Sequence, residues 1–218
     1  MQGQRSTIVV IAAGDADPRA AVHLPPDAPV VAADGGVDTA LALGLDVTVA
    51  VGDFDSVTTS GLDTAARQGS RVIRHAEQKD ATDLELALDE ALLLGAGRII
   101  VLGDPGGRLD HLTAGLALLG HERYADVEID AYLGAAAAHV IRSERRLDGT
   151  PGELVSLLAL HGPAEGVVTE GLAYPLRGET LEPGSSRGVS NIFETPSARV
   201  TVASGVLLAL RPGEHERR

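Results

Sequence analysis

The sequence predicts an α/β domain with a mainly parallel sheet, followed by a smaller all-β sandwich domain. Over residues 1–125, short apolar runs alternate with helical patterns, which is typical of βα units. From residue 126 the helical periodicity disappears, and short apolar runs follow one another between Gly, Pro and Asp turns. We therefore expect two domains, residues 1–125 and 126–218.

The first domain repeats strand, turn and helix. Its predicted strands are apolar runs at residues 7–13, 29–33, 47–51 and 98–102, with a further strand at residues 71–75. Its predicted helices are residues 37–44, 60–68, a segment capped by Thr82 or Asp80 that ends at Gly95, and 108–119. This alternation predicts a Rossmann-like sheet with helices on both faces.

The second domain has a different texture. Its predicted strands are residues 127–133, 137–142, 153–160, 167–171, 199–203 and 206–210. Turns at this density favour an antiparallel sheet or sandwich.

Composition excludes several classes of protein. The 218 residues carry a formal net charge of −13, which argues against a nucleic-acid partner because such binding depends on clustered Lys and Arg. There is no cysteine, so disulfides and thiol chemistry are excluded and a reducing compartment is permitted. No apolar stretch reaches the ~18 residues of a membrane span, so we expect no membrane partner and a cytoplasmic location.

Two aspartates one residue apart, Asp53 and Asp55, follow the apolar run that ends at Gly52. Their repulsion needs a counter-ion, and a hard cation such as Mg²⁺ takes oxygen ligands and commonly brings a phosphate. Other predicted strands are also followed by acidic loops, which contain Asp34, Asp80 with Asp83, and Asp110. Because parallel strands end at one edge of a sheet, we expect these carboxylates to share a crevice.

Several of these residues also have a structural interpretation, which the pair Asp53 and Asp55 does not favour. A single aspartate such as Asp34, Asp80 or Asp110 is more often a helix cap or a turn residue. Lys79 and Arg108 either bind phosphate oxygens or remain solvated surface charges. The sequence has no P-loop, no Gly-x-Gly-x-x-Gly after the first strand and no Gly-x-Ser-x-Gly. The remaining hypothesis is chemistry on a magnesium-bound phosphate ester or anhydride.

The assembled motifs resemble those of the thiamine pyrophosphokinase family, whose members move a diphosphate group from ATP to thiamine. The matching segments are ADGG at 33–36, GDFDS at 52–56, KDATD at 79–83, GGRLDH at 106–111 and GVSN at 188–191. GDFDS and GGRLDH are specific, whereas ADGG and Ser-Asn alone are weak. The resemblance implies an α/β domain followed by a β-sandwich domain, in a homodimer with each active site between the α/β domain of one subunit and the β domain of the other.

The resemblance also implies residue roles. Asp53, Asp55 and Asp83 would hold Mg²⁺ and the ATP phosphates, and these three with Asp110 would be the catalytic residues. The residues that it places around ATP are Asp34, Gly35, Gly36, Ser56, Lys79, Asp80, Thr82, Gly107 and Arg108. Ser190 and Asn191 would contact the thiamine pyrimidine from the partner subunit. The thiamine hydroxyl would attack the β-phosphorus of ATP and release AMP.

One departure from the family leaves alternatives open. A tryptophan stacks on thiamine in some members, and this chain has none, which leaves Phe193 and Tyr174 as the aromatic residues near the matching segment. A related diphosphokinase that acts on another heterocyclic alcohol, such as a pterin, is one alternative. A non-catalytic protein that binds thiamine diphosphate or a nucleotide is the other. The crowded aspartates argue against it, because a pure binder gains nothing from them.

Overall fold

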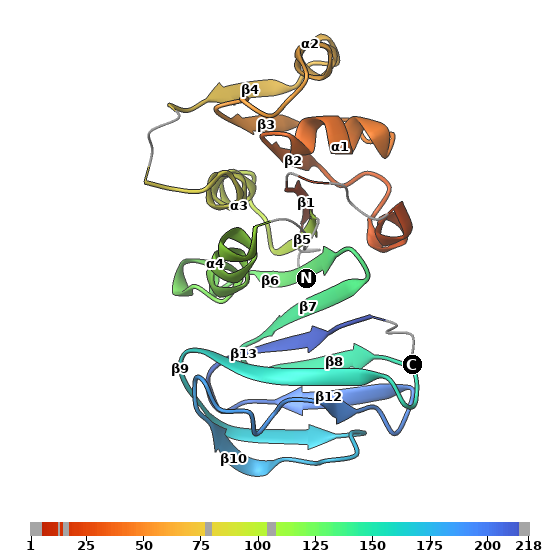
Figure 1. Ribbon diagram of the computed structural model, residues 1–218, viewed down its shortest axis with the longest axis vertical. Coiled ribbons are helices and arrows are strands. Elements are labelled where there is room, and N and C mark those ends of the chain that lie inside the picture. Colours follow the sequence, from red (N-terminus) through yellow and green to blue (C-terminus); the bar gives the residue numbers. More distant parts are fainter. Residues whose placement is uncertain (1–5, 13, 15–17, 77–79, 104–107, 214–218) are drawn as a thin grey trace, which may run out of the picture. The chain divides into compact units, whose positions relative to one another are not determined.

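The computed structural model describes residues 6–12, 14, 18–76, 80–103 and 108–213. The chain divides into two compact units, one formed by residues 1–115 and 126–134 and the other by residues 116–125 and 135–218 (Figure 1). The domain boundary at residue 126 stays a prediction.

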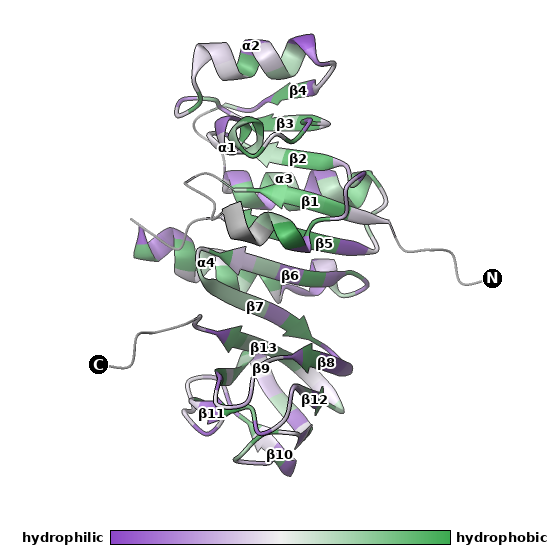
Figure 2. Ribbon diagram, turned by 90° about the vertical axis from the view of Figure 1, so that its right-hand side faces the viewer, coloured by the Kyte–Doolittle hydropathy of each residue, from purple (hydrophilic) through white to green (hydrophobic). Residues whose placement is uncertain are grey.

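The first unit contains a parallel sheet. Its strands, in spatial order, are β4 (Arg71–Arg74), β3 (Val49–Gly52), β2 (Val30–Ala33), β1 (Thr7–Ile11), β5 (Arg98–Gly103) and β6 (Glu128–Leu133). Every residue of β2 and β3 is buried, as expected of strands covered on both faces. Figure 2 shows this apolar character along β1, β2 and β3. The predicted fold class is confirmed for this unit.

Helices lie on both faces of this sheet, as predicted. The α-helices that follow its strands are α1 (Gly36–Ala42), α2 (Thr59–Arg67), α3 (Asp83–Leu93) and α4 (Leu109–Leu119), and a 3-10 helix, η1 (Pro18–His23), follows β1. Helix α1 covers one face and α3 the other (Figures 1 and 2). No helix within the described residues is both long and apolar enough to cross a bilayer.

The strand β6 differs from the prediction. The sequence pattern places residues 127–133 among the antiparallel strands, whereas β6 pairs in parallel with β5. Its polar residues explain the difference, because Glu128 and the buried Asp130 both form ion pairs with Arg98 of β5, at 3.2 and 2.7 Å. Because these charges are paired, β6 can lie in a parallel sheet although its sequence alternates polar and apolar residues, as a half-exposed antiparallel strand does.

The second unit is antiparallel, as predicted. It contains η2 (Glu122–Tyr124), β7 (Ala136–Ile141), β8 (Glu144–Asp148), β9 (Leu154–Glu170), β10 (Arg177–Leu181), β11 (Asn191–Ile192), β12 (Ser197–Thr201) and β13 (Ser204–Arg211). The strand pairs among the described residues of this unit are antiparallel. Its core is apolar and includes Leu157, Phe193 and Leu207.

Strand β9 is 17 residues long, although the sequence predicts two short strands at 153–160 and 167–171. The chain passes through left-handed conformations at His161 (φ 60°) and Gly166 (φ 62°) without leaving the sheet. Its pairing with β13 shifts register near there, between Ser204 and Val206. Residues that usually end a strand form an irregularity within this one.

Candidate functional site

Three carboxylates meet where β2 and β3 end. Asp34 follows β2, Asp53 and Asp55 follow β3, and one carboxylate oxygen from each lies within 4.8 Å of the others. Asp34 is buried, Asp53 is half-buried and Asp55 is exposed, so the group opens outward from the sheet edge. Like charges at this spacing repel, and oxygen donors of this kind fit a hard divalent cation.

Asp34 is the most constrained of the three. Its backbone is left-handed (φ 45°), and its N–H donates to the Val51 carbonyl at 2.9 Å. The residue is only 4% exposed. The Ser56 hydroxyl donates a hydrogen bond to its Oδ2, while its Oδ1 is buried without a hydrogen-bond partner in the described structure.

A tight turn places Asp53 and Asp55 on the same side. Phe54 between them is left-handed (φ 64°) and packs into the core of the first unit with 9% of its surface exposed. The Arg74 guanidinium lies 5.0 Å from the centre of its ring. The Asp55 N–H donates to Asp53 Oδ1 at 3.2 Å. Because the Phe54 ring is buried, Asp53 and Asp55 on either side of it lie at the edge of the sheet, nearer the surface.

Asp83 lies close to this group but outside it. It is the first residue of α3, whose N-cap is Thr82, with the Thr82 hydroxyl accepting from the Glu85 N–H at 3.2 Å. A Cβ atom on Gly52 would lie 3.1 Å from Asp83 Oδ1 and 3.1 Å from Asp34 Cβ. A glycine at position 52 therefore allows both aspartates to approach the end of β3. Asp80 is exposed.

Arg108 and Asp110 form a two-point ion pair. Arg108 Nε donates to Asp110 Oδ1 at 3.2 Å, and its terminal nitrogen donates to Oδ2 at 2.6 Å. Hydrogen bonds from Arg108 are the main reason that the pKa of Asp110 falls to about 2. Both side chains are exposed. Lys79 and Gly107, which were predicted to bind ATP, lie outside the described residues.

The glycines after Asp34 have different local requirements. A Cβ atom on Gly36 would lie 2.3 Å from the Ile11 carbonyl oxygen, so α1 can pack against the end of β1 only with glycine there. Gly35 has an ordinary helical backbone (φ −55°). Packing thus explains why position 36 is glycine, but it does not explain Gly35.

Sequence reasoning missed Asp38, which holds the loop after Asp55 against α1. Its carboxylate accepts from the Thr58 N–H and the Thr58 hydroxyl, both at 2.7 Å. The same hydroxyl caps α2 by accepting from the Gly61 N–H at 3.0 Å. A Cβ atom on Gly61 would lie 1.9 Å from Asp38 Oδ1. The pair is 20 residues apart, so no short spacing pattern reveals it.

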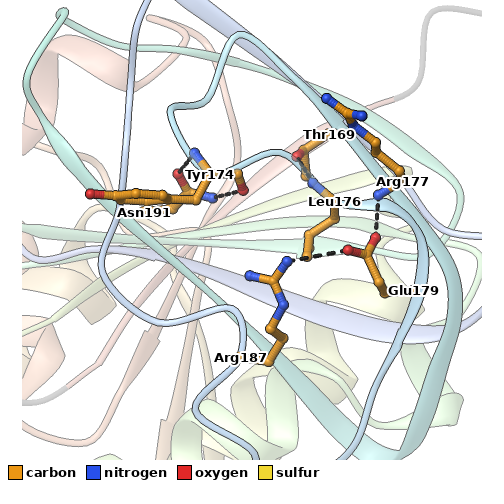
Figure 3. Close-up of polar contacts among 7 residues, drawn as sticks. All are labelled: Thr169, Tyr174, Leu176, Arg177, Glu179, Arg187 and Asn191. Atoms are coloured by element: carbon orange, nitrogen blue, oxygen red, sulfur yellow. Dashed lines mark hydrogen bonds and ion pairs between the residues drawn. The ribbon is translucent and has the colours of Figure 1, made fainter.

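In the second unit, the buried Asn191 holds the backbone of Tyr174 by hydrogen bonds (Figure 3). Asn191 Oδ1 accepts from the N–H groups of Tyr174 at 3.0 Å and Ile192 at 2.9 Å, and its Nδ2 donates to the Tyr174 carbonyl at 2.8 Å. Tyr174 is 56% exposed, whereas Phe193 is 1% exposed and belongs to the core. Ser190 is left-handed (φ 59°) and donates its N–H to the Ser156 hydroxyl at 3.1 Å.

The chain after Tyr174 is fixed by further polar contacts (Figure 3). The Leu176 N–H donates to the Thr169 hydroxyl at 2.9 Å. Glu179 accepts from the Arg177 N–H and from the Arg187 guanidinium, the latter at 3.2 Å. The hydrogen bond from the Arg177 N–H is the main cause that lowers the pKa of Glu179. The exposed Tyr174 is therefore followed by a segment that several hydrogen bonds hold in place.

The parallel sheet with acidic groups at its carboxyl edge, followed in the chain by an antiparallel β unit, defines a class of two-domain α/β proteins. Two family models assign the chain more narrowly. "Thiamin pyrophosphokinase, catalytic domain" matches residues 26–131, and "Thiamin pyrophosphokinase, vitamin B1 binding domain" matches residues 138–207. The chain therefore belongs to the thiamine pyrophosphokinase family.

Known proteins agree with this assignment. The chain is 27% identical over 192 residues to the thiamine pyrophosphokinase of Bacillus subtilis, covering 83% of this chain and 86% of the relative. A crystal structure of thiamine pyrophosphokinase from Bacillus subtilis has the same fold, with a TM-score of 0.84, 24% identity and coverage of 96% and 100% of the two chains. The thiamin pyrophosphokinase structure from Geobacillus thermodenitrificans gives a TM-score of 0.80 at 26% identity, over 97% of this chain and 99% of that one.

Proposed function

We propose that this protein transfers a diphosphate group from ATP to thiamine and forms thiamine diphosphate and AMP. The observation that carries this proposal is the meeting of Asp34, Asp53 and Asp55 at one sheet edge. This acidic group occurs in a chain that both domain models of the family match. Family membership does not favour the pterin or non-catalytic alternatives.

In the proposed reaction, the hydroxyl oxygen of thiamine forms a bond to the β-phosphorus of ATP. The bond from that phosphorus to the oxygen bridging to the α-phosphate breaks, and AMP leaves with its electron pair. The hydroxyl proton passes to a carboxylate of the site. Little covalent chemistry falls to the protein, so positioning and charge neutralisation supply most of the acceleration.

The carboxylates fit Mg²⁺ as the cofactor. A buried carboxylate oxygen without a hydrogen-bond partner, Asp34 Oδ1, points to a cation among three oxygen donors. Asp53 and Asp55 would hold the ion, with Asp83 beside them when the nucleotide is present. When bound, Mg²⁺ would neutralise charge on the phosphates and orient them for transfer.

The nucleotide would lie along the sheet edge next to these aspartates. Arg108 is already oriented by Asp110 and would offer its guanidinium to phosphate oxygens, so that Asp110 acts through it. Ser56 holds Asp34. The other proposed ATP contacts are Gly35, Gly36, Lys79, Asp80, Thr82 and Gly107.

Tyr174 is our candidate for the ring that contacts thiamine. It is the exposed member of the two aromatic residues near the matching motif, and the thiazolium ring of thiamine is a cation that an aromatic face attracts. Asn191 would act by positioning Tyr174, because its amide already bonds the Tyr174 backbone. Ser190, next to Asn191, would complete this part of the site. The net charge of −13 would also favour a cationic substrate.

We further propose a cytoplasmic homodimer in which the β unit of one subunit completes the site of the other. This arrangement rests on the family resemblance alone.

An assay for AMP release with ATP, Mg²⁺ and thiamine tests the reaction. We expect thiamine-dependent AMP formation by the wild type and a loss of at least about a hundredfold in Asp55→Asn, because the variant lacks one ionic oxygen ligand at the phosphates. The exposed Asp63→Asn on α2 makes the same charge change away from the site and should retain activity. AMP formation with a pterin alcohol but not with thiamine would support the pterin alternative. Binding of both substrates without turnover would support the non-catalytic one.

A further inference from the structure

We infer that Asp34 binds the divalent cation directly, together with Asp53 and Asp55, before any nucleotide arrives. This inference rests on the proposed magnesium site and departs from the ligand set Asp53, Asp55 and Asp83 that the family resemblance implies. It assigns the buried aspartate to the ion itself, whereas the motif comparison places it on the nucleotide side.

The first ground is the state of the Asp34 carboxylate. The residue is 4% exposed, and its Oδ1 has no hydrogen-bond partner in the described structure. A buried ionised oxygen is costly unless it is hydrogen-bonded, paired or bound to a metal. Asp34 also supplies one of the three carboxylates that converge at the sheet edge. A cation held among them would compensate its burial.

The second ground is that Asp34 cannot turn away from the site. It directly follows β2, in which every residue is buried, and its N–H is bonded to the Val51 carbonyl of β3 at 2.9 Å. The Ser56 hydroxyl holds the second carboxylate oxygen. One oxygen is therefore fixed by a hydrogen bond while the other remains for a ligand. A carboxylate that is held in this way loses little conformational freedom when it binds an ion.

Asp83 is placed differently. It begins α3, where the positive end of the helix dipole favours a carboxylate whether or not a metal is present. It lies near Gly52 but does not belong to the group of carboxylates within 4.8 Å of one another. We expect it to join the site when phosphate is present and to add little to the binding of the ion alone.

Mn²⁺ titration followed by electron paramagnetic resonance, with no nucleotide and no thiamine, tests this inference. We expect Asp34→Asn to weaken Mn²⁺ binding at least about tenfold, and Asp83→Asn to change it by less than about threefold. Asp63→Asn controls for the loss of one negative charge far from the site. Equal Mn²⁺ affinity in the wild type and Asp34→Asn would overturn the inference, as would an equal loss in Asp34→Asn and Asp83→Asn.

Thermal melting gives a second readout on the same proteins. Without metal, Asp34→Asn should melt at or above the wild-type temperature because one repelling charge is gone, and Mg²⁺ should no longer raise its melting temperature. Should Asp34→Asn fail to fold, Ser56→Ala keeps the carboxylate but removes the hydroxyl that holds it. That variant should bind Mn²⁺ a few-fold more weakly, and wild-type binding by it would count against the inference.

These measurements are independent of diphosphate transfer. If the wild type makes no AMP, but Asp34→Asn weakens Mn²⁺ binding much more than Asp83→Asn does, the proposed reaction is refuted and the role of Asp34 stands. Normal turnover with unaltered Mn²⁺ binding in Asp34→Asn would do the reverse.

Discussion

Arg108 and Asp110 show how one side chain can orient another. Their two-point contact keeps the guanidinium oriented although both side chains are exposed. An arginine that is held in this way differs from the solvated surface charge that its sequence position equally allows. The sequence contains both residues, but only the structure shows that they bind each other.

The pKa of Asp110 gives a test of this pairing. Because Arg108 lowers that pKa to about 2, the carboxylate should stay ionised through the range in which an ordinary Asp titrates, about pH 3.9. The pair would persist above that range and would be lost only as pH falls through about 2. Side-chain carboxyl NMR should show this midpoint, and Arg108→Gln should return it to the ordinary value. A midpoint near 4 in the wild type would show that the pair does not persist in solution.

Phe54 explains how two repelling aspartates come to lie side by side. A bulky residue with positive φ is uncommon, and the conformation persists here because the ring is buried. The core of the first unit therefore determines the direction of the Asp53 and Asp55 carboxylates. The motif indicates the acidic pair, but the turn conformation that orients it depends on burial elsewhere.

At the scale of elements, helix caps anchor the loops of the candidate site. Thr58 caps α2 and also bonds Asp38 of α1, whereas the Thr82 hydroxyl caps α3 by accepting from the Glu85 N–H. The loop with Asp53 and Asp55 is thus anchored at its far end by a contact between two helices. The start of α3, which carries Asp83, has the simpler cap.

Alanine substitution at the two caps should separate these roles. Thr82→Ala should lower the free energy of unfolding by about 1 kcal/mol, the usual effect of losing a threonine cap. Thr58→Ala should lower it by roughly 0.5–1 kcal/mol more, because it also removes a hydrogen bond to a carboxylate. Urea denaturation of the two variants and the wild type measures both values. Equal losses would mean that Asp38 adds nothing to the cap.

The elements that the sequence predicts best are those with one dominant signal. Apolar runs closed by glycine or aspartate indicate β1, β2, β3 and β5, and helical spacing indicates α3. The strands β8 and β10 were missed because their residues are mostly charged or exposed, with Leu147 and Leu181 as their buried members. Strand β6 was assigned to the wrong kind of sheet because its charges are satisfied by Arg98.

The site shows the same division. Spacing within the sequence indicates Asp53 and Asp55 as a pair, and the strand-end rule indicates that other aspartates join them. Which aspartate joins depends on the left-handed backbone of Asp34, its burial and the hydroxyl of Ser56. These are tertiary features. Residue types alone therefore indicate the converging aspartates, Asp34 among them, but not which of them lies innermost.

At the scale of the whole molecule, the proposed homodimer predicts complementation between two impaired variants. Asp55→Asn damages the acidic site of the first unit, and Tyr174→Ala removes the exposed ring of the second. If each active site takes one part from each subunit, a mixed dimer contains one intact site. Coexpression of equal amounts should restore about a quarter of the wild-type activity, since half of the dimers are mixed and each has one working site. Activity no higher than the average of the two variants would exclude a shared site.

Strand β13 lies between β7 and β9 in the sheet of the second unit, although it follows both of them in the chain. During synthesis on the ribosome, these two strands emerge long before the strand that joins them. The antiparallel sheet therefore cannot close until residues 204–211 have left the exit tunnel, whereas the strands of the parallel sheet are all present once β6 has emerged. A nascent chain should thus hold a formed first unit and an incomplete second unit, whose unpaired strand edges are open to aggregation until translation reaches β13.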